Sequence, residues 1–167
     1  MPMVFMTYAN VVFSYGIERF AKKAATVGMD GVILPDVPFE EKEEFASVFR
    51  KEGMDLISLI ASTSHDRISM IAKEAEGFVY CVSSMGVTGQ GASFHKEVIS
   101  YLKSVKEQAQ IPVMMGFGIR TAADVAPMKD IIDGAIVGSH FINLMEENQY
   151  DLDVAKEYIQ TFKSELK

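Results

Sequence analysis

Pro112-Val-Met-Met-Gly-Phe-Gly-Ile-Arg-Thr121 begins as a short apolar run, breaks at two glycines and leads into the helical segment Ala122–Lys129. A short apolar run bounded by glycine is typical of a buried strand. A helical pattern directly after it is typical of a parallel βα unit, because parallel strands need a crossover connection. The stretch therefore predicts a strand at Pro112–Gly116, then a glycine-rich loop and a helix.

The same pattern repeats on both sides of this stretch. The other predicted strands are Met3–Tyr8, Gly31–Pro35, Leu56–Ala61, Phe78–Ser83 and Ala135–Gly138. Amphipathic segments predict further helices at Ile17–Val27, Glu40–Glu52, Asp66–Glu76, Lys96–Ala109 and Leu152–Lys167. The strands are apolar throughout, which predicts that a parallel sheet is buried on both faces.

Two α/β architectures fit strictly alternating strands and helices: an open doubly wound sheet and part of a (β/α)8 barrel. A doubly wound sheet usually has a glycine-rich turn after its first strand. Here the first strand leads into Ala9-Asn-Val-Val-Phe13, which contains no glycine. We therefore expect the barrel, with residues 1–167 forming a single domain.

Composition narrows the class of protein. The 167 residues are 49% hydrophobic, enough for a packed core, and the net charge of −7 disfavours nucleic-acid binding. No apolar run reaches the roughly 18 residues that a membrane span needs, and no signal peptide is recognisable, so we expect a cytoplasmic protein. Cys81 is the only cysteine, which excludes an internal disulfide and a cysteine-cluster metal site.

Three glycine-containing loops follow predicted strands: Ser84–Gly91, Gly116–Thr121 and Gly138-Ser139. Glycines let backbone N–H groups approach an anion, and the start of a helix adds a favourable dipole. Late loops of a barrel form a recurrent phosphate site. The alternative is that these glycines only make tight βα turns. The second loop is a poor dinucleotide fingerprint, since its sixth position is Thr121.

Few ionisable residues follow the strands. Asp36 could act as a general base or bind substrate, or it could cap the next helix or bond to loop backbone, and both readings stay open. Asp30 and Asp133 precede strands and are expected to be turn residues on the stability face. The spacing of His65, His95 and His140 does not suggest metal ligation.

Tyr8 and Tyr80 lie near the ends of two strands, where they could line a pocket for an aromatic ligand or simply pack at the rim.

At these loops the sequence resembles the tryptophan synthase α subunit family. Pro2-Met-Val-Phe-Met-Thr-Tyr-Ala-Asn10 resembles its third strand, and Gly31-Val-Ile-Leu-Pro-Asp-Val-Pro38 its fourth. Phe78-Val-Tyr-Cys-Val-Ser-Ser-Met-Gly-Val-Thr-Gly89 resembles its sixth strand and mobile loop. Val113-Met-Met-Gly-Phe-Gly-Ile119 and Ala135-Ile-Val-Gly-Ser139 resemble its seventh and eighth strands.

The resemblance implies retro-aldol cleavage of indole-3-glycerol phosphate to indole and glyceraldehyde 3-phosphate. It implies no cofactor in this chain, since pyridoxal phosphate belongs to a partner β subunit in an α2β2 assembly. Carried over by position, the phosphate ligands would be Gly89, Gly118, Gly138 and Ser139. The substrate pocket would be lined by Tyr8, Tyr80, Thr88, Phe117 and Ile136. Asp36 matches a family position that supports loop geometry and is not the catalytic carboxylate.

The family's catalytic glutamate and aspartate lie before the segment that this sequence matches. No residue here occupies those positions, so the resemblance implies the last six βα units of a barrel, inactive alone. Six strands cannot close a barrel, so we expect open edges and self-association. Two other functions remain: a non-catalytic phosphate-binding or partner-docking fragment, and another phosphate-binding barrel enzyme. The latter usually carries a lysine, aspartate or histidine at a strand end, and no lysine follows a predicted strand here.

Overall fold

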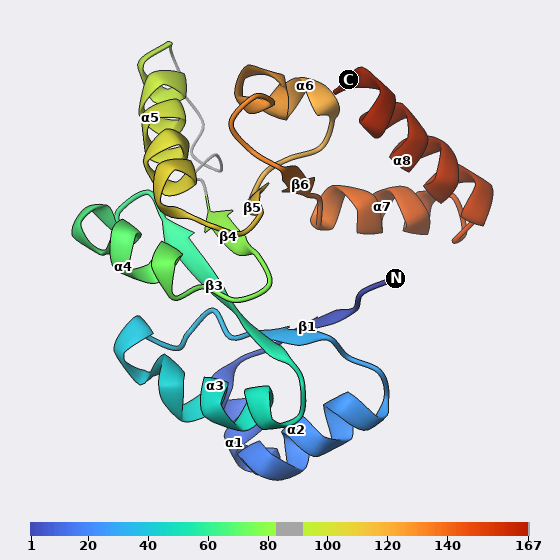
Figure 1. The fold of residues 1–167 in the computed structure, drawn as a ribbon. Coiled ribbons are helices and arrows are strands. Elements are labelled where there is room, and N and C mark those ends of the chain that lie inside the picture. Colours follow the sequence, from blue (N-terminus) through green and yellow to red (C-terminus); the bar gives the residue numbers. More distant parts are fainter. Residues whose placement is uncertain (83–91, 167) are drawn as a thin grey trace.

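A computed structural model describes residues 1–82 and 92–166. Its six strands form one sheet in the order β1-β2-β3-β4-β5-β6, so every strand pairs with its neighbours in sequence, and every pair is parallel (Figure 1). The strands are β1 (Val4–Met6), β2 (Gly31–Ile33), β3 (Asp55–Ala61), β4 (Val79–Val82), β5 (Val113–Gly116) and β6 (Gly134–Ile136).

This strand order separates the two architectures. A doubly wound sheet reverses its strand order at a switch point, whereas a barrel adds each strand beside the previous one. The observed order never reverses, which confirms an incomplete (β/α)8 barrel of six units. β1 and β6 are the open edges of this sheet.

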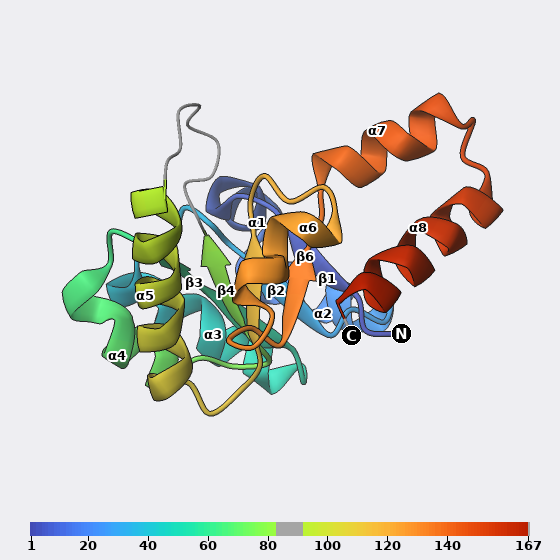
Figure 2. The same ribbon diagram turned by 90° about the horizontal axis from the view of Figure 1, so that it is seen from above.

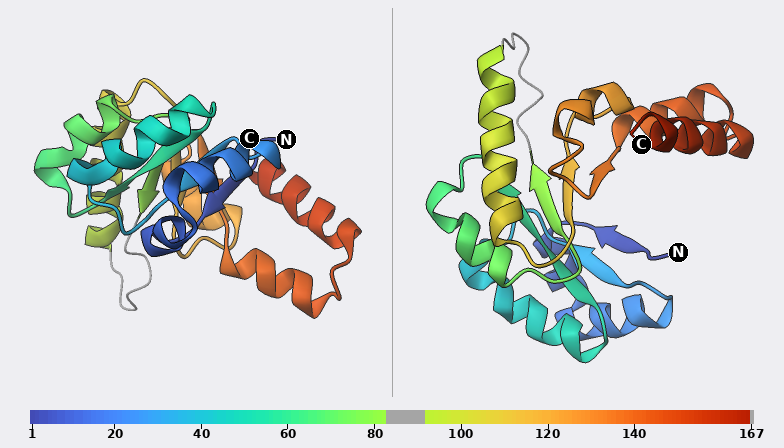
Figure 3. Two further views of the ribbon diagram at one scale, coloured as in Figure 1. Left: turned by 90° about the horizontal axis from the view of Figure 1, so that it is seen from below. Right: turned by 45° about the horizontal axis from the view of Figure 1, so that its top comes forward.

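Helices connect the strands. The α-helices are α1 (Ala9–Tyr15), α2 (Ile17–Thr26), α3 (Lys42–Lys51), α4 (Ile68–Lys73), α5 (Ala92–Gln108), α6 (Ala122–Val125), α7 (Ser139–Glu147) and α8 (Leu152–Glu165). Short 3₁₀ turns, η1 (Phe39–Glu41), η2 (His65–Arg67) and η3 (Ala126–Met128), precede α3 and α4 and follow α6. Figure 3 shows the curved sheet with the helices outside it.

The core is divided by the sheet. One outer cluster includes Ile60, Val79, Leu102 and Met115 and lies among β3–β5, α4 and α5. A second outer cluster includes Val32, Phe45, Phe49 and Leu56 and lies under α2 and α3. On the inner face, Ile33, Ile57 and Tyr80 form a smaller cluster, against which Ile136 packs. Alternate residues of β3 therefore serve opposite faces, as a strand's period of two requires.

The expectation that every strand is buried is wrong for β1. Val4, Phe5 and Met6 are 36%, 37% and 56% exposed. β1 pairs only with β2, so no strand of the described residues covers its other edge. Helix α1, in the connection between β1 and α2, was not predicted from the sequence.

The C-terminal helices α7 and α8 extend away from the rest of the chain as a hairpin (Figure 2). Tyr158 of α8 donates a hydrogen bond from its hydroxyl to the carbonyl of Arg120, 2.7 Å away, and its ring lies near Phe141 and Phe162. Phe162 and Leu166 also pack against the outer cluster, so the hairpin is attached through the loop that follows β5 and through the C-terminal part of α8.

Candidate functional site

The carboxyl ends of β4, β5 and β6 lie side by side. Gly116, the last residue of β5, is in register with Val82 of β4 and Ile136 of β6. The chain leaves all three strands at the same level, so Phe117-Gly118 lies beside the Gly138-Ser139 loop. This arrangement confirms that two of the predicted glycine loops share one edge; the third, 84–91, lies outside the described residues.

The loop after β5 has an unusual backbone. Phe117 and Gly118 have φ angles of 88° and 73°, in the left-handed region that favours glycine. A left-handed phenylalanine is strained, which is typical of a functional turn held by its surroundings. Phe117 is 55% exposed and lines a cavity at the carboxyl ends of the strands.

Asp124 fixes the far end of this loop. Its carboxylate accepts hydrogen bonds from the N–H groups of Arg120 and Thr121, both at 2.9 Å, and completes a capping box at α6. Partial burial acts to raise the pKa of Asp124, but these backbone bonds outweigh it and hold the pKa below its ordinary value. The loop is thereby preorganised before any ligand arrives.

Helix α7 begins at Ser139, and Gly138 is its N-cap residue. The first N–H groups of a helix have no partner within the helix and favour an anion. A Cβ built on Gly138 would meet no heavy atom of the described residues within 4 Å, so this position is not crowded. The Gly118 and Gly138-Ser139 loops therefore bring two glycines and the start of α7 to one edge of the sheet.

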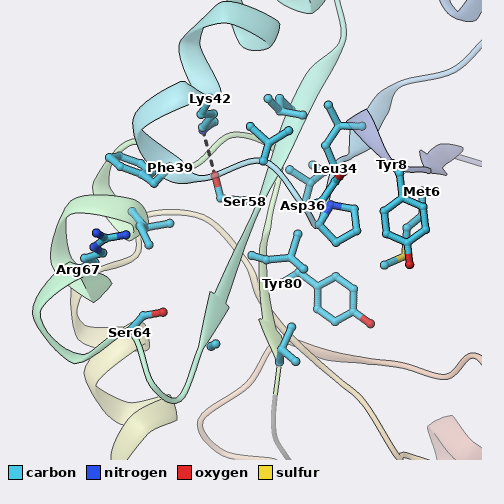
Figure 4. A pocket seen from close by; sticks show the side chains of 18 of the residues that line it. Met6, Tyr8, Leu34, Asp36, Phe39, Lys42, Ser58, Ser64, Arg67 and Tyr80 are labelled. Atoms are coloured by element: carbon cyan, nitrogen blue, oxygen red, sulfur yellow. Dashed lines mark hydrogen bonds between the residues drawn. The ribbon is translucent and has the colours of Figure 1, made fainter. Parts of the chain in front are cut away.

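A cavity of about 560 Å³ opens at the carboxyl ends of β1–β4. Figure 4 shows that Met6, Tyr8, Leu34 and Tyr80 line one side of β3. We call this side, together with Asp36 and Phe117, the inner pocket. Its walls are mainly apolar and aromatic, as a site for a planar aromatic ligand requires.

Tyr80 is positioned by a glycine. A Cβ built on Gly116 would lie 2.2 Å from Cε2 of Tyr80 and 2.5 Å from its hydroxyl oxygen. The ring therefore occupies space that only glycine leaves free. Burial raises the pKa of the Tyr80 phenol, so the group stays a neutral donor throughout the physiological range.

Asp36 bonds to backbone, which is one of the two roles left open by the sequence. The backbone group belongs to α1 and not to the helix that follows Asp36. The two carboxylate oxygens of Asp36 accept from the N–H of Ala9 at 3.0 and 3.2 Å. Tyr8, the N-cap residue of α1, offers no capping bond from its own side chain. Asp36 therefore supplies the missing cap across the inner pocket and holds the residue next to Tyr8.

The remaining predicted residues are placed as follows. Ile136 packs beside Tyr80 in the inner cluster but is not among the described residues that line the cavity. Thr88 and Gly89 lie outside the described residues. His140 stacks near Tyr158, with ring centroids 5.7 Å apart. Cys81 is buried, and burial raises the pKa of its thiol to about 11, so it is unreactive.

Asp30 and Asp133 lie directly before β2 and β6, at the amino edge of the sheet, away from the carboxyl edge where the predicted site lies. Among the described residues, no group of three or more histidine, cysteine or acidic side chains could hold a metal ion. Within the same residues, no helix is long and apolar enough to cross a bilayer.

Sequence reasoning missed the other side of the cavity. Across β3 from Tyr80, the cavity is lined by Phe39, Lys42, Ser58, Ser64, Arg67 and Ile71, which we call the outer pocket (Figure 4). Lys42 lies in a helix whose acidic residues suggest a solvated face. The sequence feature that could have indicated this side of the cavity is Ser58, a polar residue inside the otherwise apolar predicted strand Leu56–Ala61.

Comparison with known proteins agrees with this geometry. A family model described as "Tryptophan synthase alpha chain" matches residues 1–167. The tryptophan synthase alpha chain of Lachnospira eligens is 56% identical over 99% of this chain and 63% of its own length. The structure of tryptophan synthase subunit alpha from Campylobacter jejuni is 32% identical, with a TM-score of 0.83 over 96% of this chain and 64% of that one.

A chain of the α2β2 tryptophan synthase complex from Pyrococcus furiosus is 26% identical, with a TM-score of 0.83 over 98% of this chain and 67% of its own. The present chain spans about 63% of the length of its curated relative from Lachnospira.

Proposed function

The chain belongs to the tryptophan synthase alpha chain family, and from this we propose that it supplies the phosphate-binding and aromatic walls of a lyase site. The reaction is the retro-aldol cleavage of indole-3-glycerol phosphate to indole and glyceraldehyde 3-phosphate. The observation that supports the proposal is the shared carboxyl edge, where the two glycine loops lie beside an aromatic pocket.

In this proposal the phosphate is bound by backbone N–H groups of Gly118, Gly138 and Ser139 and by the hydroxyl of Ser139. Gly89 is proposed as a further phosphate ligand, and Thr88 as the residue that closes the loop after β4 on the substrate. The strained Phe117 and the capped loop behind it support this role, because donors fixed in advance need no reordering when the ligand binds.

The indole ring is proposed to lie in the inner pocket, between Tyr8 and Phe117 and against Ile136. Tyr80 would line the glycerol end, since its phenol reaches the carboxyl edge beside Gly116. Tyr8 and Phe117 are 62% and 55% exposed, which leaves their rings free to stack on a planar ligand.

Cleavage also needs proton transfer, and general acid–base groups typically contribute ~10²–10⁴-fold. Asp36 is the one carboxylate among the described residues that line the cavity, and both its oxygens already accept from Ala9. We therefore propose that Asp36 is a supporting residue and that the 167-residue chain alone does not turn over the substrate.

The test uses the purified chain with indole-3-glycerol phosphate. We expect no release of indole above background, but saturable binding of glycerol phosphate that Ser139→Glu abolishes through charge repulsion. Ser164→Glu, in α8, is the matched control and should bind normally. Release of indole from the chain alone would contradict its inactivity. Binding that Ser139→Glu leaves unchanged would overturn the phosphate site and favour another barrel function.

A complementation experiment tests whether the family's catalytic glutamate and aspartate can be supplied by a second chain. The portion of the Lachnospira eligens relative that this chain does not match, added in trans, should restore indole release. Restored activity that Ser139→Glu removes would support the lyase. Ligand binding without any restored activity would favour a non-catalytic phosphate-binding or partner-docking role.

The open edges suggest how the chain associates. β1 carries exposed Val4, Phe5 and Met6, and unpaired strand edges template pairing with other chains. We propose that residues 1–167 form one domain that self-associates through β1 and β6. Light scattering at micromolar concentration should give a mass above the 18.5 kDa of one chain. A single monomeric species would contradict this.

The partner proposed for the assembled enzyme is a tryptophan synthase beta subunit, as the α2β2 complex of the Pyrococcus furiosus relative suggests. We assign no cofactor to this chain, since pyridoxal phosphate belongs to the beta subunit in this family. A cytoplasmic location is proposed from the family alone. Co-purification with a beta subunit from a related bacterium tests the assembly.

A further inference from the structure

Lys42 is a buried cation in the outer helix layer. It is the first residue of α3, and only 9% of its surface is exposed. Its ammonium group donates to the hydroxyl of Ser58 at 2.9 Å and to the carbonyl of Glu74 at 3.2 Å. Neither partner is charged, and no carboxylate of the described residues lies within 4.0 Å of the Lys42 nitrogen.

This arrangement is unusual on energetic grounds. Buried charges are normally paired, because removal of an ion from water costs several kcal/mol unless a counter-ion compensates. Burial lowers the pKa of Lys42, although Glu76 and Glu74 act at longer range to raise it. An anion in the cavity that Lys42 lines would compensate this buried charge directly.

The outer pocket provides donors for that anion. An ammonium group has three N–H bonds, and two are used here. The Ser58 oxygen accepts from Lys42, while its own proton has no acceptor among the described residues, and the hydroxyl of Ser64 is likewise unpaired. At the mouth of the pocket, Arg67 holds Glu40 at 3.1 Å, with both side chains more than half exposed.

The walls limit what can enter. Phe39 and Ile71 close the apolar sides, and Figure 4 shows Lys42, Ser58, Ser64 and Arg67 around the space between them, on the opposite side of β3 from Tyr80. Among the described residues, Glu40 is the only carboxylate that forms an ion pair at this mouth. Such an exposed ion pair is weak, so an anion can replace Glu40 as the partner of Arg67.

We propose that the outer pocket binds a phosphate-type oxyanion, with Lys42 and Ser58 at its buried end and Arg67 closing the mouth after releasing Glu40. This site is separate from the edge formed by Gly118 and Gly138-Ser139, because β3 divides the two sides of the cavity. It does not rest on the proposed lyase function. An occupant here neutralises the buried charge and ties α3 to α4.

The test measures the binding of inorganic phosphate to the full chain by calorimetry, with stoichiometry resolved in site-blocked variants. Ser139→Glu removes the carboxyl-edge site and should leave one phosphate per chain. Adding Lys42→Met to that background should weaken the remaining site by about tenfold or more, because it removes a charge-assisted donor. If the remaining phosphate binds with the same affinity after Lys42→Met, the proposal is wrong.

Two surface variants keep the test independent of any effect of Lys42→Met on folding. Arg67→Gln should weaken phosphate binding by about three- to tenfold, and Glu40→Gln should strengthen it by a few-fold because it frees Arg67. Arg19→Gln, on the distant helix α2, is the matched control for lost positive charge. Equal affinities in all three variants would contradict the site and leave Lys42 as a bridge between Ser58 and α4.

Discussion

The amino and carboxyl edges of the sheet use polar groups in opposite ways. At the amino edge, carboxylates accept from backbone N–H groups where strands begin: Asp30 from Met3, just before β1, and Asp133 from Val113, both at 2.7 Å. At the carboxyl edge, no other described residue accepts from the N–H groups of Ser139 and His140 at the start of α7, and Phe117 makes a strained turn nearby. Saturated groups stabilise the fold, whereas open donors are available to a ligand.

The difference gives a rule for reading the molecule. A carboxylate that accepts from backbone at either edge is structural, which applies to Asp36 although it lines the cavity. A donor without an acceptor is a candidate for binding. The following predictions test the rule at both edges, in order of decreasing effect on stability or binding.

The largest effect is expected at Gly116. Gly116→Ala places a Cβ 2.2 Å from the Tyr80 ring, so the ring or the strand must move. Overpacking of this kind typically costs about 1–3 kcal/mol. Urea denaturation should show that loss in the free energy of unfolding, and glycerol phosphate binding should weaken because the Phe117 turn begins at the next residue.

A double-mutant cycle separates collision from backbone strain. Tyr80→Ser removes the ring, so Gly116→Ala should lower the unfolding free energy much less in that background than in the original chain. Equal losses with and without the ring would mean that Tyr80 is not the cause.

Asp133 is the next test, on the saturated edge. It accepts from Val113 and from Lys106 at 2.5 Å, and its side chain is about two-fifths exposed. Asp133→Ala leaves the Val113 N–H unpaired, which should cost about 1 kcal/mol of unfolding free energy. Phosphate binding should be unchanged; a variant that lost binding without losing stability would break the distinction between the edges.

The same residue predicts an acid dependence. Burial acts to raise the pKa of Asp133, but Lys106 and the Val113 N–H outweigh it and lower the pKa in the folded state. The resulting stability is present above the unfolded-state pKa of about 3.9 and is lost as pH falls through the lower folded value. The urea concentration at the unfolding midpoint should fall as the pH is lowered below about 4. The fall should be smaller in the Asp133→Asn variant.

How much could be predicted from sequence follows from the range of each interaction. Local patterns predicted the six strands and the glycine loops at Gly118 and Gly138, because strand and turn signals lie within a few residues. Helix α1 was not predicted: its cap comes from Asp36, 27 residues away. The burial of Lys42 depends on Ser58 and Glu74, 16 and 32 residues away. Such partners are visible only once the strands are paired.

The smallest effect, and the sharpest test of the rule, is at Asp36. If this carboxylate only caps α1, Asp36→Asn should keep one acceptor for the Ala9 N–H, while Asp36→Ala should cost about 0.5–1 kcal/mol and speed hydrogen exchange at Ala9. In the complemented enzyme, Asp36→Asn should then retain most of its turnover. A loss approaching the ~10²-fold or more expected for a general base would show that the bond to Ala9 is released during the reaction, and that a saturated group can still be catalytic.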